Sequence, residues 1–152
     1  MNYVDNEEYE KNQAQEESGA EESISEESRK KDYFATWEVG GETYRMKLTT
    51  PEQLQLEKVY KRNLFALMGD ADNLPTLSTM LQITHASMKP FHHGIKLKQV
   101  ESLYEKYIKE GGSMLQFYVE TYMKIFAVSG FFSASTAEEM TASMDKMAEE
   151  MK

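Results

Sequence analysis

One stretch, residues 33–50, constrains the fold of this chain more than any other. Its first half alternates, with Tyr33, Ala35, Trp37 and Val39 on one side and Thr36 and Glu38 on the other. Its second half alternates in the same way, with Tyr44, Met46 and Leu48 opposite Thr43, Arg45 and Lys47. Gly40-Gly41 lies between the halves, and glycine readily adopts the positive φ angles of a tight turn. Period-two patterning on both sides of a two-residue glycine turn predicts a β-hairpin.

A helix is expected to begin directly after the hairpin. Thr50 can cap it, Pro51 suits the first helical position, and Gln53 stands three residues after the cap, as in a capping box. The apolar face of the hairpin is then predicted to continue along this helix through Leu56, Val59, Tyr60, Leu64, Leu67 and Met68. The pattern specifies structure and contains no catalytic constellation.

Apolar repeats predict further helices along the rest of the chain. A second helix is expected over residues 75–89, because Pro90 disfavours the helical state in the residue before it. A third is expected over residues 97–110, where two glycines end it. A fourth, over residues 114–129 after a Ser113 cap, is apolar on nearly every side, which is typical of a helix at the centre of a core.

The last helix carries a narrow methionine stripe. Ser135 is its expected cap, with Glu138 closing the capping box. Ala137, Met140, Met144, Met147 and Met151 recur on one face, and the opposite face is charged and polar. Methionine is flexible and polarisable, so such a stripe suits ordinary packing or an adaptable contact. It could dock on its own chain, pair with another copy, or hold a foreign helix. The candidate partner-binding residues are Phe131, Phe132, Met140, Met144, Met147 and Met151.

The charge of the chain is concentrated at its N-terminus. The formal net charge is −9, and residues 1–32 carry 11 acidic and 4 basic side chains, so the remainder is nearly neutral. Residues 1–31 have few apolar side chains and are predicted to form a disordered acidic tail. Such a tail is a solubilising leader, a docking segment, or an acidic mimic of nucleic acid. Residues 32–130 are expected to form a hairpin plus helical domain, and residues 131–152 a C-terminal amphipathic helix.

The sequence lacks the residues that several classes of function require. The chain has no cysteine, so disulfides and thiolate chemistry are excluded. No apolar run approaches the roughly 18–20 residues that span a bilayer, and no basic footprint for nucleic acid is seen. The segment 70–73 resembles part of a calcium loop but lacks its glycine and bidentate glutamate, so a polar loop is expected. We predict that the protein is not an enzyme and has no cofactor and no metal site. We interpret His85, His92 and His93 as structural residues.

The hairpin region resembles one known family. The segment from Tyr44 to Thr50, read YRMKLTT after Gly40-Gly41, and the following Leu56-Glu57 pair are similar to the opening of tail assembly chaperones of long-tailed (siphovirus-type) bacteriophages or prophages. In that family a Gly-x-x-Tyr-x-Leu-Arg-Leu-Thr-Thr phrase leads into a helix with a Leu-Glu pair. The match covers about a quarter of the chain. Its motif is structural rather than catalytic. The long acidic leader departs from the family pattern.

The resemblance implies a non-enzymatic function in tail assembly. The family binds the helices of the tape-measure protein and keeps that protein soluble until tail tube protein polymerises. The expected location is the cytoplasm of the bacterial host and not the mature virion, with no membrane and no nucleic acid as partner. Self-association into a homo-oligomer around the bound helices would fit this picture. The alternatives are a structural tail or neck component of the virion, and an acidic inhibitor that mimics nucleic acid.

Together these patterns predict a mainly helical α+β protein. An N-terminal β-hairpin is followed by four to five helices, and a disordered acidic tail precedes them.

Overall fold

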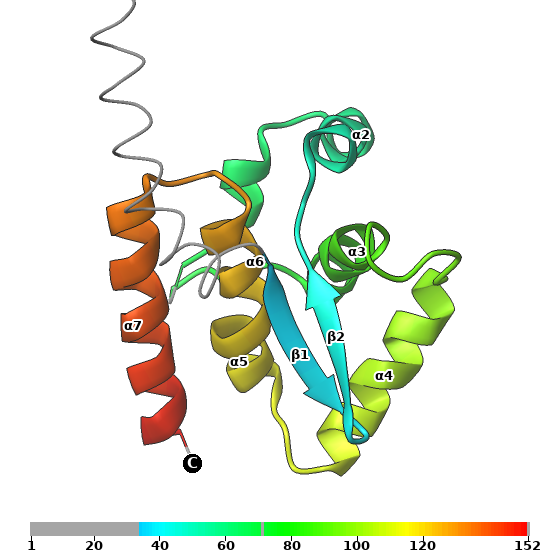
Figure 1. Cartoon of the computed structure of the whole chain (residues 1–152), viewed down its shortest axis with the longest axis vertical. Coiled ribbons are helices and arrows are strands. Elements are labelled where there is room, and N and C mark those ends of the chain that lie inside the picture. The colour runs from blue at the N-terminus through cyan, green and yellow to red at the C-terminus, as the bar shows by residue number, and fades with distance from the viewer. Residues whose placement is uncertain (1–33, 71, 152) are drawn as a thin grey trace, which may run out of the picture. The chain divides into compact units, whose positions relative to one another are not determined.

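The computed structural model describes residues 34–70 and 72–151. Residues Phe34–Lys152 form one compact unit, and the predicted acidic tail at residues 1–31 lies outside the described part. The fold is mainly helical with one two-stranded sheet, as predicted (Figure 1). The elements, in chain order, are β1 (Ala35–Val39), β2 (Glu42–Met46), α2 (Thr50–Tyr60), η1 (Leu64–Leu67), α3 (Leu77–Met88), α4 (Leu97–Lys109), α5 (Met114–Phe117), η2 (Tyr118–Tyr122), α6 (Met123–Val128) and α7 (Ala134–Glu150).

The hairpin has the predicted turn and alternation. β1 and β2 pair antiparallel, with Trp37 opposite Tyr44, and both turn glycines have positive φ, 63° at Gly40 and 78° at Gly41. Along β1 the buried and exposed positions alternate without exception. The hairpin packs against α3 through β2 and against α4, η2 and α6 through β1. Figure 1 shows these helices on either side of it.

The turn gives a first prediction. A Cβ at Gly41 would meet nothing within 4 Å, so a substitution there is penalised by its backbone angle alone. Gly41→Val should lower the free energy of unfolding by about 1–2 kcal/mol, whereas Gly41→Asn should cost less because asparagine tolerates the left-handed region. Urea unfolding of both variants measures this difference, and equal losses would contradict the assignment of the cost to φ.

The first helix differs from the prediction at both ends. Its N-cap is Thr49 rather than Thr50, and the Thr49 side chain makes no capping hydrogen bond. Gln53 does not close a capping box. Its amide instead donates to the carbonyls of Leu48 and Ser129, at 2.9 and 3.1 Å, and so ties the start of α2 to the end of α6. The Gln53 side chain thus donates to backbone carbonyls here, whereas in a capping box it would accept from the N-cap N–H.

The predicted apolar face through Met68 is not one continuous helix. α2 ends at Tyr60 because Lys61 adopts the left-handed conformation, with φ 54°, and the 3₁₀ turn η1 follows. The Asn63 side chain caps that turn by accepting from the Phe65 N–H at 2.8 Å. Val59 is 61% exposed, in contrast to its predicted place on the apolar face.

The helix α3 packs against β2, and η2 and α6 pack against β1. Seven residues of α3 are buried: Met80, Leu81, Ile83, Thr84, Ala86, Ser87 and Met88. The predicted fourth helix is present as the continuous run α5–η2–α6, with a π turn in its middle. Its side chains Phe117, Tyr122, Ile125 and Phe126 are fully buried, which confirms that this helix is central to the core.

The C-terminal helix starts earlier than predicted. Ser133, not Ser135, is its N-cap, and the Ser133 Oγ accepts from the Thr136 N–H at 3.3 Å. Ser135 lies inside the first turn instead. α7 packs against η2 and α6, and only Met144 and Ala148 of its residues are buried. This helix is therefore held by a narrow strip of its surface.

Candidate functional site

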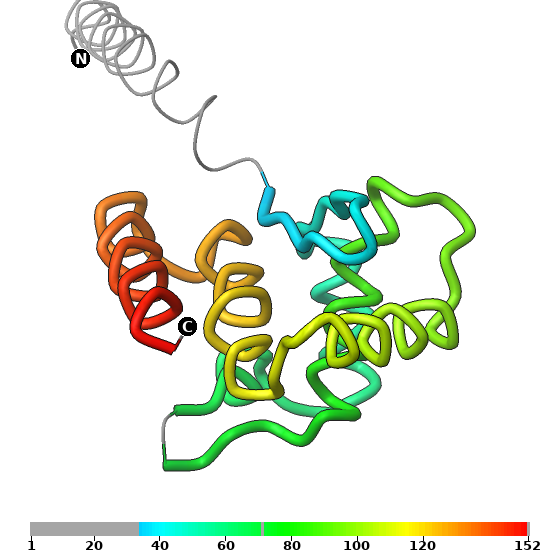
Figure 2. Tube along the Cα trace, turned by 90° about the horizontal axis from the view of Figure 1, so that it is seen from below, coloured from blue at the N-terminus to red at the C-terminus, as the bar shows by residue number. Residues whose placement is uncertain are grey.

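An apolar groove of about 540 Å³ lies between α7, the run α5–η2–α6 and the segment 68–74. Three methionines of α7, Met144, Met147 and Met151, form one wall. The lining residues from the other elements are Met68, Gly69, Asp70, Leu74, Leu115, Tyr118, Val119 and Met123. Figure 2 shows α7 alongside α5–α6, with residues 68–70 and 72–74 below them in that view. In the following we call this the methionine groove.

Two tyrosines of the π turn hold the segment that forms the opposite wall. The Tyr122 hydroxyl donates to the Leu67 carbonyl at 2.6 Å, and the Tyr118 hydroxyl donates to the Met68 carbonyl at 3.2 Å. Their rings stack with centroids 6.0 Å apart. π turns within helices are frequent at functional sites. Here the turn coincides with the two side chains that fix the groove wall in place.

One carboxylate, Asp70, lies among the residues that line the groove. Burial raises the pKa of the Tyr118 hydroxyl, and the charge of Asp70 raises it further. Burial also raises the pKa of Tyr122, with smaller contributions from Tyr60 and Tyr118. Both hydroxyls therefore keep their protons at neutral pH and serve as hydrogen-bond donors. Asp70 is the single carboxylate among the residues that line the groove, and no basic residue lines it.

The loop around Asp70 is a polar connection, as expected. The Asp70 Oδ1 accepts from the backbone N–H groups of Asp72 and Asn73, at 2.9 and 2.8 Å. Gly69 has a φ of 72°, and a Cβ there would lie 2.6 Å from the Pro75 ring. In the described parts of the chain, no group of three or more His, Cys, Asp or Glu side chains could hold a metal ion.

The six predicted partner-binding residues do not all lie at one place. Met144 is buried, while Met147 and Met151 are 46% and 37% exposed and line the groove. Met140 is half-buried against the core and does not line the groove. Phe131 and Phe132 pack around Phe65 of η1, with centroids 6.4 and 5.3 Å from its ring. The structure thus brings three of the six together, and whether any of them binds a partner stays a prediction.

Sequence reasoning missed the opposite side of the groove. Leu115, 47% exposed, and Met123 lie on the helix that was predicted to be apolar all round. That excess of apolar positions over what a core needs was the available signal. Nothing local indicated that Met68 and Leu74, some 70 residues before the stripe, would face it.

Two of the three histidines, His85 and His92, have structural contacts. The His85 Nε2 is 2.8 Å from the Ile95 carbonyl oxygen, and the His92 Nε2 accepts from the Arg45 N–H at 3.0 Å. His92 thereby ties β2 to the loop before α4, and its ring packs against Tyr44 at 5.3 Å.

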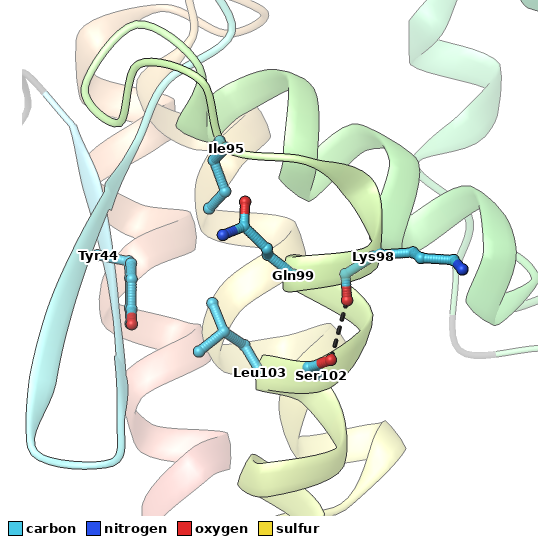
Figure 3. A pocket seen from close by; sticks show the side chains of 6 residues that line it. All are labelled: Tyr44, Ile95, Lys98, Gln99, Ser102 and Leu103. Carbon is cyan, nitrogen blue, oxygen red and sulfur yellow. Dashed lines mark hydrogen bonds between the residues drawn. The ribbon is translucent and has the colours of Figure 1, made fainter.

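A second hollow, of about 360 Å³, lies between the hairpin and α4 (Figure 3). Its lining residues are Tyr44, Ile95, Lys98, Gln99, Ser102 and Leu103. Ser102 donates its hydroxyl proton to the Lys98 carbonyl at 3.0 Å, and the Lys98 amine points away from Tyr44. The six residues include no carboxylate, imidazole or thiol that could activate a nucleophile.

A polar cleft of about 420 Å³ lies on the other flank of α7. Four carboxylates line it, from Glu38, Glu120, Asp145 and Glu149, and Lys124 is its one basic residue. Lys124 forms an ion pair with Asp145 at 2.5 Å. α7 therefore separates an apolar groove on one flank from an acidic cleft on the other.

Comparison of the chain with protein-family models, curated proteins and solved structures finds no match. Over the described ranges, no helix is both long enough and apolar enough to span a bilayer.

Proposed function

We propose that the protein is a tail assembly chaperone that binds amphipathic helices of a phage tape-measure protein in the methionine groove. The observation that carries this proposal is the groove itself, which leaves large apolar side chains exposed between two helices and a fixed loop. A helix laid in such a groove buries its apolar stripe against side chains that can adapt to it. The resemblance of residues 44–57 to the chaperone family supports the same conclusion.

The proposed chemistry is binding without turnover. A long helical protein that has no tube around it exposes apolar stripes, which associate with each other unless something covers them. A carrier must therefore offer apolar surface while staying dispersed, and the net charge of −9 favours dispersion. Growing tube protein would then displace the carrier, so the carrier would remain in the host cytoplasm and be absent from the finished virion.

A single substitution in the groove tests this function. Met147→Glu places a charge where a partner's apolar stripe would lie, and should reduce co-purification of the co-expressed tape-measure protein at least tenfold. Because Met147 is 46% exposed, the thermal midpoint should change little. Val59→Glu, at an apolar residue that is 61% exposed on α2 and outside the groove, is the matched control and should co-purify normally.

Three further outcomes separate the alternatives. If the tape-measure protein stays insoluble with the wild-type chain, the chaperone function is wrong. Detection of this chain in purified virions would favour a structural tail or neck component instead. Deletion of residues 1–31 addresses the acidic mimic, since a truncated chain that still solubilises the tape-measure protein does not act through its acidic leader.

A further inference from the structure

The surroundings of the methionine groove have a definite charge. Asp70 is exposed at one rim. Its negative charge contributes to the raised pKa of the Tyr118 hydroxyl. Two backbone N–H groups hold one of its oxygens, so the carboxylate has a fixed position. A cation brought to this rim would meet a preorganised negative charge, which binds better than one that must first be ordered.

The opposite rim, on α7, is also acidic. At about 100° per residue, Glu150 and Glu139 lie roughly 60° and 80° beyond Met147, on the side away from Met144. Both are exposed, and Lys146 lies about 100° from Met147 on the same side. In total α7 carries five acidic residues and one basic residue. Both long edges of the groove therefore present carboxylates next to an apolar floor.

This charge argues against α7 of a second copy as the occupant. The α7 helix of a second copy has an apolar stripe that is only partly covered, but its acidic face would meet the acidic rims. Like charges brought together at a partly desolvated rim oppose association.

We propose that the methionine groove selects amphipathic helices whose apolar stripe is flanked by lysine or arginine. This preference rests on the proposed helix-binding function and adds the charge of the partner to it. The stripe of the bound helix packs on Met147, Met151 and Leu115. Its flanking cations then pair with Asp70 on one rim and with Glu150 and Glu139 on the other.

Three designed helical peptides, each about as long as α7, test the preference with the full chain. One has an apolar stripe flanked by lysine, one has the same stripe flanked by glutamate, and one is a scrambled version of the lysine peptide without a stripe. Fluorescence anisotropy at low ionic strength should give at least tenfold tighter binding for the lysine-flanked stripe than for either other peptide. Added salt should reduce the difference in affinity between the lysine-flanked and glutamate-flanked peptides, because salt screens the rim charges.

Variants locate the effect at the rims. Asp70→Asn keeps the oxygen that accepts the loop hydrogen bonds, and combined with Glu139→Gln and Glu150→Gln it should reduce the lysine-over-glutamate ratio to below threefold. Glu105→Gln and Glu110→Gln, at exposed positions outside the groove, remove charge without touching the rims and should leave the ratio unchanged.

The outcomes distinguish this inference from the proposed function. Equal binding of the lysine and glutamate stripes overturns the charge preference and leaves helix binding intact. Equal binding of the scrambled lysine peptide shows attraction to the acidic chain as a whole, and also overturns it. If neither stripe peptide binds and the tape-measure protein does not co-purify, both the inference and the function are wrong.

Discussion

Phe117→Ala is expected to lower the free energy of unfolding by about 3–5 kcal/mol. Phe117 is fully buried, and its ring contacts Trp37 and Tyr104 with centroids 5.1 and 5.2 Å away, and Tyr107 at 6.0 Å. This aromatic cluster joins β1, α4 and α5. Removal of the Phe117 ring leaves a cavity between these three elements, which cannot move together to fill it. The cost therefore includes both lost apolar burial and lost aromatic contacts.

The measurement uses the single tryptophan of the chain. Trp37 is 3% exposed, so its emission should shift to longer wavelength when the cluster opens during thermal or urea unfolding. The thermal midpoint should fall by roughly 10–25 °C. Val59→Ala, at a site that is 61% exposed, is the control and should change stability by less than about 0.5 kcal/mol. A similar small effect for Phe117→Ala would show that the aromatic cluster does not hold these elements together.

The second large effect is a loss of stability at alkaline pH. Burial raises the pKa of Tyr107 to about 12, with Glu120 and Tyr104 adding to the shift, and burial raises the pKa of Tyr122 as well. In the unfolded chain a tyrosine ionises near pH 10. Below about pH 10 both states hold these protons, so the stability that they contribute is fully present.

Above about pH 10 the unfolded chain releases protons that the folded chain still holds. Tyr122, which is fully buried, should then lower the free energy of unfolding by about 1.4 kcal/mol for each further pH unit. Tyr107 should add to the loss until the pH passes about 12, where its folded form ionises too. Urea unfolding at a series of pH values from neutral to strongly alkaline measures the slope.

Tyr122→Phe isolates one of these protons. At neutral pH the variant should lose about 1–3 kcal/mol, because the Leu67 carbonyl loses its 2.6 Å hydrogen bond. Above about pH 10 its stability should fall less steeply than that of the wild type. An unchanged alkaline slope in the variant would mean that Tyr122 does not supply the pH dependence.

The hairpin and the order of helices could be predicted because their signals are local. Strand alternation and the Gly40-Gly41 turn act within 14 residues, and both strands and the turn formed as expected. The caps were less predictable. At the starts of α2 and α7 more than one serine or threonine is present, and the choice between Ser133 and Ser135, or Thr49 and Thr50, depends on neighbouring packing. Gln53 illustrates this, since it bonds to Ser129, which is 76 residues away.

By itself, the sequence determined that the last helix would have one apolar face, which carries the methionine stripe, and one charged face. Tertiary structure decided what that stripe faces. Met68 and Asp70 line the same groove as Met147, and Tyr118 and Tyr122 hold that segment by donating to the carbonyls of Met68 and Leu67 from 50 and 55 residues away. Hydrogen bonds and packing between segments so far apart have no periodic signature in the chain, whereas the amphipathic face of a helix repeats every turn.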